Sequence, residues 1–125
     1  MSTDLIEFLR ARIAEDEAVA RGAFGDDLGG GWRARDDSGY LDDLDGAQIT
    51  DGLQPDEAQH IAHWDPARVL AECEAKKRLL EQFRLRGDSV RATVRPTTGG
   101  VWDDLLRLLA LPYAEHEDYR EEWRP

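Results

Sequence analysis

Apolar residues recur at helical spacing near both ends of the chain and predict a helix in each place. The first helix is expected at residues 4–21, where Asp4 followed three residues later by Glu7 has the pattern of a helix start. The other is expected at residues 101–111, and Pro112 ends it because the residue before a proline disfavours helical geometry.

A third apolar pattern covers residues 55–86 and predicts two consecutive helices. They divide at Asp65-Pro66, because aspartate caps a helix well and proline suits its first position. Gly87 is expected to end the second of these helices, since glycine commonly follows a helix terminus.

Strands are expected where glycine and aspartate interrupt the helical pattern. Residues 30–51 contain the turn signals Asp37-Ser38-Gly39 and Asp45-Gly46 between short pieces, which predicts a small antiparallel meander. Residues 89–95, with the sequence SVRATVR, alternate and predict one more strand.

The chain ends in a segment, residues 112–125, that holds two tyrosines and one tryptophan among charged residues. A free tail would expose these rings to water, so we expect the segment to dock on the fold. A tail that binds a partner is the alternative. Together the elements predict one α+β domain over residues 1–125, with three or four helices packed with a small antiparallel sheet.

Charge is distributed unevenly along the chain. The formal net charge is −11, and residues 26–57 hold ten acids and two bases. Nucleic-acid phosphates repel such a protein, so direct binding to DNA or RNA is not expected. The excess of acids either keeps the protein dispersed in water or forms a face that meets a basic partner.

Candidate chemistry is sparse in this sequence. His60 and His63 lie one helical turn apart with Glu57 one turn earlier, which is a weak pattern for a metal site. The DDLDG stretch lacks the first and last ligands of a calcium loop. Cys73 falls on an apolar helix face and is expected to be an inert buried thiol. No catalytic residues and no cofactor are predicted, and an enzyme is the less favoured interpretation.

Two pairs of opposite charges fall within apolar helix faces. Arg12 with Asp16, and Glu72 with Lys76, are each four residues apart. They predict a partly buried polar layer between two helices. The alternative is that these long side chains extend to water at the edge of a groove.

Aromatic residues are the candidates for partner contact, because tryptophan and tyrosine prefer cores and interfaces. The candidates for partner binding are Trp64, Tyr113, Tyr119 and Trp123. For each tryptophan, a place in the core is the competing interpretation.

Three blocks of the sequence resemble a known family. The strings DLIEFLRARIAEDEAVAR, HIAHWDPARVLAECEAKKRLLE and LRLLALPYAEHEDYREEWRP are similar to blocks of the uncharacterised actinobacterial and actinophage domain-of-unknown-function family six-two-two-one. The resemblance implies a bacterial or phage accessory protein and no particular activity. His63 and Trp64 stand where relatives often have arginine and histidine. Relatives also often carry a cysteine pair before the last block, and this chain does not.

These observations favour a non-catalytic protein-interaction or regulatory module. Its partner would be an unknown protein or a second copy of the chain. The first alternative is an acidic, phage-linked inhibitor that imitates nucleic acid, and the second is a metal-assisted hydrolase using His60 and His63. One cysteine and no apolar run of membrane-spanning length lead us to expect a cytoplasmic protein without a membrane segment.

Overall fold

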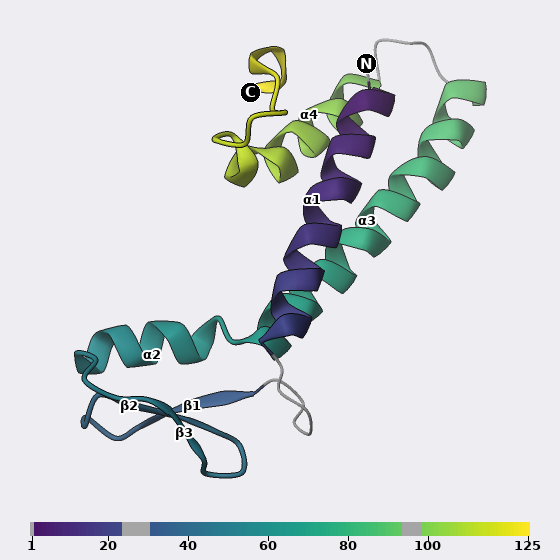
Figure 1. Ribbon diagram of the computed structural model, residues 1–125. Helices are drawn as coiled ribbons and strands as arrows, with labels where there is room; N and C mark the ends of the chain where they lie inside the picture. Colours follow the sequence, from purple (N-terminus) through teal and green to yellow (C-terminus); the bar gives the residue numbers. More distant parts are fainter. Residues whose placement is uncertain (1, 24–30, 94–98) are drawn as a thin grey trace. The chain divides into compact units, whose positions relative to one another are not determined.

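The computed structural model describes residues 2–23, 31–93 and 99–125. Its elements are, in chain order, α1 (Ser2–Gly22), β1 (Trp32–Arg35), β2 (Tyr40–Asp43), β3 (Gln48–Thr50), α2 (Pro55–His63), α3 (Pro66–Thr93), α4 (Gly99–Ala110) and the 3-10 turns η2 (Leu111–Tyr113) and η3 (Glu121–Trp123) (Figure 1). The described residues thus hold four α-helices and a three-stranded antiparallel sheet, and the predicted α+β class is confirmed.

The chain divides into two compact units. One consists of Met1–Ala14 and Ala75–Pro125, and we call it the helical unit. The other, Glu15–Glu74, carries the strands and is called the sheet unit. The expectation of a single domain over residues 1–125 stays a prediction.

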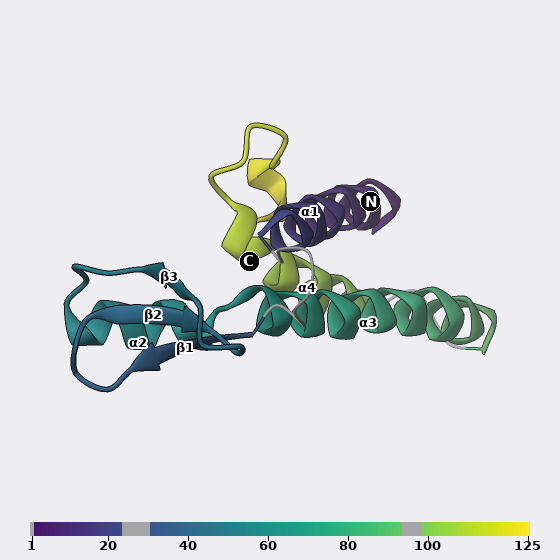
Figure 2. The same cartoon turned by 60° about the horizontal axis from the view of Figure 1, so that its bottom comes forward.

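The sheet unit is built on a meander in the order β1-β2-β3, and α2 lies against one face of this sheet (Figure 2). Leu41 of β2 and Ala58 of α2 are both fully buried. The turn between β1 and β2 depends on Gly39, which has a φ of +79°. A Cβ atom at this position would lie 2.0 Å from the Leu53 carbonyl oxygen, so no other residue fits without a shift of the backbone.

The start of α3 is tied to the sheet through Asp65. One carboxylate oxygen accepts the Arg68 N–H at 2.8 Å, which is the helix cap that the sequence predicts. The other oxygen accepts the Trp32 N–H at 2.9 Å, at the start of β1. The Asp65 carboxylate therefore accepts a hydrogen bond from a free N–H group at the start of α3 and also holds the first residue of β1 in place.

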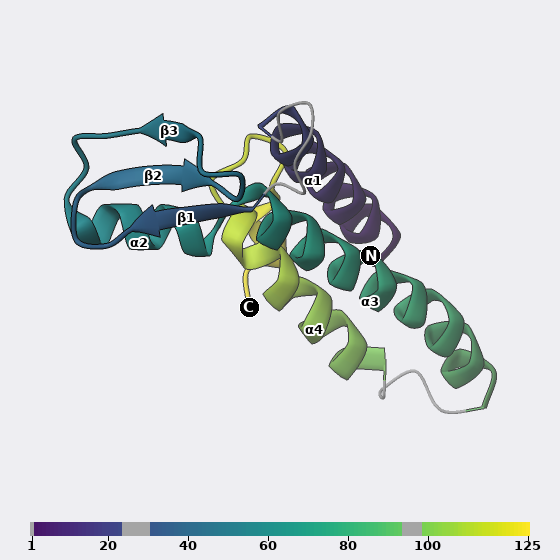
Figure 3. The ribbon, with the colours of Figure 1, turned by 90° about the horizontal axis from the view of Figure 1, so that it is seen from below.

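The helical unit has its core where α1, α3, α4 and the C-terminal tail meet. Within this unit, α1 and α3 run antiparallel and α4 lies beside α3 (Figure 3). The buried side chains come from all four segments: Leu5, Phe8, Leu9, Ile13, Leu80, Phe83, Leu106, Ala110 and Trp123. Phe83 and Trp102 join α3 to α4 in an edge-to-face contact, with ring centroids 5.2 Å apart.

The predicted strand at residues 89–95 is wrong for the residues that the structure describes. α3 continues to Thr93, past the expected end at Arg86, while residues 94 and 95 lie outside the described part, as does residue 30 of the predicted meander. A glycine inside a helix costs about 1 kcal/mol, which a long helix tolerates, so Gly87 does not end it. An alternation of apolar and polar residues over a short stretch forms a strand only where a neighbouring strand is present to pair with it.

No helix among the described residues combines the length and apolar character that crossing a membrane requires.

Candidate functional site

The C-terminal tail, residues 111–125, packs on the first turns of α1 within the helical unit (Figure 1). Phe8 is the centre of this contact. Its ring centroid lies 5.0 Å from Trp123, 5.9 Å from Tyr119, 5.8 Å from His116 and 6.4 Å from Tyr113. Four rings of the tail therefore surround one phenylalanine, in the edge-to-face and tilted arrangements that aromatic pairs prefer.

Polar contacts join the same two segments. The Arg12 side chain, 9% exposed, lies 3.8 Å from a carboxylate oxygen of Asp118. An Arg12 guanidinium nitrogen also lies 2.7 Å from Nδ1 and 2.5 Å from Nε2 of His116. At the outer end of the contact, Arg120 pairs with Asp4 at 3.0 Å. The tail is thus held by apolar packing with a buried guanidinium in its middle.

An open hollow of about 400 Å³ lies between α1 and the tail. Its lining combines Arg12 and Arg120, three carboxylates and the rings of Phe8 and Trp123. Four of the five charged residues in the hollow form the ion pairs Arg12–Asp118 and Arg120–Asp4. Most charges of the hollow therefore join the tail to α1.

The four aromatic candidates for partner binding differ in exposure. Trp123 is 4% exposed, and Tyr113 and Tyr119 are half-buried. Trp64 is 49% exposed at the end of α2, with the Arg68 guanidinium 4.5 Å from its ring centroid. Among these four residues, Trp64 offers the largest exposed fraction to a partner.

The residues of the predicted polar layer also contact groups outside that layer. Glu72 pairs with Arg68 at 3.2 Å. Lys76 lies 3.3 Å from the Tyr113 hydroxyl and 5.4 Å from the centre of that ring. Arg12 is buried and contacts the tail, while Asp16 is half-buried. A single layer formed by all four residues stays a prediction.

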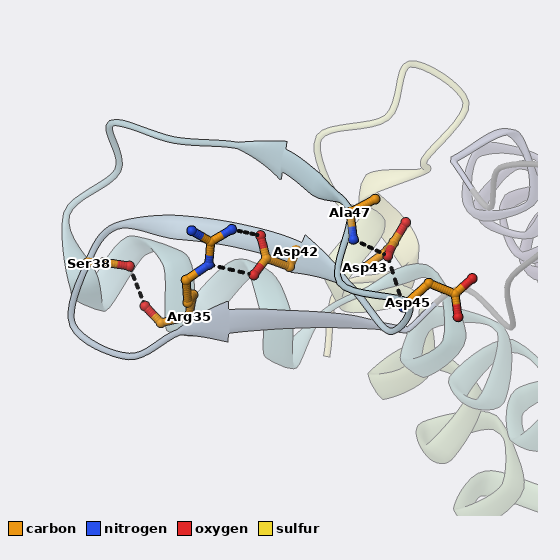
Figure 4. A network of polar contacts seen from close by, with 6 residues as sticks. All are labelled: Arg35, Ser38, Asp42, Asp43, Asp45 and Ala47. Atoms are coloured by element: carbon orange, nitrogen blue, oxygen red, sulfur yellow. Dashed lines mark hydrogen bonds and ion pairs between the residues drawn. The ribbon is translucent and has the colours of Figure 1, made fainter.

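The carboxylates of the sheet have structural roles (Figure 4). Arg35 donates two hydrogen bonds to Asp42, at 2.8 and 2.7 Å, and these bonds lower the pKa of Asp42 below its ordinary value. Asp43 accepts the backbone N–H groups of Asp45 and Ala47, both at 2.9 Å. The DDLDG stretch is therefore a turn stabilised by its own aspartate.

The metal candidates His60 and His63 lie one turn apart on α2. His60 and His63 are both exposed on α2. The described residues contain no group of three or more histidine, cysteine, aspartate or glutamate side chains that could hold a metal ion. Cys73 is 1% exposed, as expected for a buried thiol.

Comparison with known proteins identifies a family but no activity. No curated protein and no solved structure matches the chain. A family model described as a family of unknown function, DUF6221, matches residues 2–125. The match covers the helices, the meander and the aromatic tail, so the chain belongs to the DUF6221 family.

Proposed function

We propose that this protein is a non-catalytic interaction module that binds a basic protein through its sheet unit. The observation that carries the proposal is the separation of charge between the two units. The sheet unit, Glu15–Glu74, has 16 acidic and 4 basic residues, a formal charge of −12. The rest of the chain has 11 acidic and 12 basic residues, a formal charge of +1.

The electric field of a sheet unit with this negative charge favours encounter with a positively charged partner and repels negatively charged proteins. It also works against pairing of two copies through this unit, because two such surfaces would repel each other. A basic protein of another kind is therefore a better partner than a second copy.

The sheet unit also offers apolar contact area among its acids. Leu44, Ile49 and Trp64 are 52%, 41% and 49% exposed. Exposed apolar side chains with charged neighbours are common at protein interfaces, where aromatic residues supply much of the binding energy. We propose that the basic partner carries apolar side chains that pack on these residues.

The cellular compartment and the source organisms of this module are also part of the proposal. We propose a cytoplasmic protein of actinobacteria or their phages, on the resemblance of the sequence blocks and the presence of a single cysteine, which suits a reducing compartment.

The test is capture from a nuclease-treated lysate of the host, followed by affinity measurement with the purified partner. We expect a basic protein whose binding weakens as salt is added. The informative variant combines Asp36→Asn, Asp37→Asn, Asp45→Asn and Asp51→Asn, which spares the structural carboxylates of Asp42 and Asp43. It is expected to raise the Kd about tenfold or more, or about 1.4 kcal/mol.

A control variant changes the net charge equally but in the helical unit, through Glu7→Gln, Asp104→Asn, Glu115→Gln and Glu117→Gln. These four residues are exposed and belong to that unit. The control should bind nearly as well as the wild type. Equal losses in both variants would show that net charge alone matters, and an empty capture would remove the proposal.

Imitation of nucleic acid is a second candidate, and the same charge of the sheet unit favours it. In that case the captured protein binds DNA or RNA, and an oligonucleotide displaces it from the chain competitively. A partner that holds nucleic acid and this chain at the same time would exclude this candidate.

A further inference from the structure

We propose that Asp51 is a site of spontaneous isomerisation to isoaspartate, whereas Asp45 is protected from the same reaction by its turn. The sequence has two Asp-Gly pairs, Asp45-Gly46 and Asp51-Gly52, and both lie in the sheet unit. Both pairs are exposed, and both glycines have positive φ, +89° at Gly46 and +75° at Gly52. The inference goes beyond the proposed function, since it concerns the covalent backbone and needs no partner.

The reaction requires an available backbone nitrogen after the aspartate. This nitrogen attacks the side-chain carboxyl carbon of the aspartate, a carbon–nitrogen bond forms, and the carboxyl hydroxyl leaves as water with the amide proton. Water then opens the five-membered succinimide ring at one of its two carbonyls, which gives either aspartate or isoaspartate. Glycine favours the attack because no Cβ atom shields its nitrogen. Asparagine closes the same ring with loss of ammonia, so the charge variant described above is used freshly purified.

The Asp45-Gly46 pair is held in a hydrogen-bonded turn. The Gly46 N–H donates to the Asp43 carbonyl oxygen at 3.1 Å. On either side of it, the N–H groups of Asp45 and Ala47 both donate to Oδ1 of Asp43 at 2.9 Å (Figure 4). Attack by the Gly46 nitrogen breaks the first bond and turns backbone that the other two bonds hold. The turn therefore opposes ring closure at Asp45.

The Asp51-Gly52 pair has no such restraint. Within the part of the chain that the structure describes, the Gly52 N–H and the Asp51 carboxylate have no hydrogen-bond or ion-pair partner. The Thr50 hydroxyl donates to the main-chain oxygen of Asp51 at 3.4 Å, which leaves the carboxylate available. No hydrogen bond is lost when the ring closes here. The bond that must break in the other pair slows closure at Asp45 about threefold or more relative to Asp51.

Isomerisation at Asp51 changes the backbone beside a close contact of the sheet unit. Isoaspartate routes the main chain through the side chain and adds one carbon before Gly52. Just beyond it, the Leu53 N–H donates to the Gly39 carbonyl oxygen at 3.1 Å. The Leu53 carbonyl oxygen also lies where a Cβ atom on Gly39 would be, so the two segments are tightly packed. We expect the Leu53 amide proton to exchange with solvent faster in isomerised chains.

The experiment follows both pairs in the same molecules. The full chain is incubated for weeks at neutral pH and physiological temperature, digested with trypsin and analysed by electron-transfer mass spectrometry, which distinguishes isoaspartate from aspartate. Both pairs fall in one tryptic peptide, residues 36–68, because Arg35 precedes it and Arg68 ends it. We expect isoaspartate to form at Asp51 about three times as fast as at Asp45, or faster. Equal rates, faster reaction at Asp45 or no isoaspartate at Asp51 would overturn the inference.

Two matched controls separate the structure from the local sequence. In guanidinium chloride, where the turn is unfolded, both pairs should react at similar rates. A preference for Asp51 that is equally large in the unfolded chain would contradict protection by the turn. Asp51→Glu keeps the charge but would need a six-membered ring, which closes far more slowly. This variant should form no isomerised product at position 51 and should leave the rate at Asp45 unchanged.

Discussion

Trp123→Ala is expected to lower the free energy of unfolding of the helical unit by about 3–5 kcal/mol. The side chain is 4% exposed, and its ring lies against Phe8 and Tyr119, with centroids 5.0 and 5.7 Å away. Truncation removes these contacts and leaves a cavity that the short tail segment cannot fill. The measurement is urea unfolding followed by far-ultraviolet circular dichroism, which does not depend on tryptophan emission.

Trp64→Ala provides the matched control, since it removes one tryptophan from a half-exposed site. The Arg68 guanidinium lies over its ring, and such a contact contributes about 0.5–1 kcal/mol at an exposed position. We expect a loss of about 1 kcal/mol or less. Similar losses for the two variants would mean that the tail does not form part of the core.

Leu106→Ala is expected to destabilise the helical unit by about 2–5 kcal/mol, whereas Leu105→Ala should cost less than about 1 kcal/mol. These two leucines are adjacent in α4 and identical in chemistry. Leu106 is 2% exposed and Leu105 is 42% exposed. The comparison of the two variants therefore tests which face of α4 is turned toward the core.

The same urea unfolding experiment, performed on both leucine variants, gives the result. A larger loss for Leu105→Ala would mean that α4 presents its other face to the core. The expected order follows from burial in the structure, because Leu106 and Ala110 are buried one turn apart while Val101, Leu105 and Leu108 are exposed along the opposite side.

The sequence predicts much of the helical framework because its signals are local. Asp65-Pro66 marks the start of α3 through capping and proline geometry, and the structure has both. The turns of the meander follow from residues such as Gly39 and Gly46, which have positive φ. Local chemistry decides these features, so no knowledge of distant contacts is needed.

Other features could not be predicted because distant contacts decide them. The apolar face of α4 is wide and includes both Leu105 and Leu106, so its pattern does not tell which of these leucines is buried. α3 ends beyond the predicted Arg86, because one glycine and a short alternation do not interrupt a long helix.

The tail contact is the clearest case. Aromatic content predicts that the tail docks, but the partner of His116 is Arg12, which is 104 positions away in the sequence. The i,i+4 rule predicts contacts along one helix, such as Arg12 with Asp16, and does not find a contact with the tail. No local signal marks His116, because it lies in an irregular segment without periodicity. Its place beside a buried guanidinium is evident only from the fold.

The most direct test of this account is an isotope-filtered NMR measurement of ring contacts at pH 8. Labelled and unlabelled chains are mixed so that contacts within one chain are distinguished from contacts between two. The account predicts contacts of Phe8 with Trp123 and Tyr119 within a single chain. Absence of these contacts, or their appearance only between two chains, would contradict it.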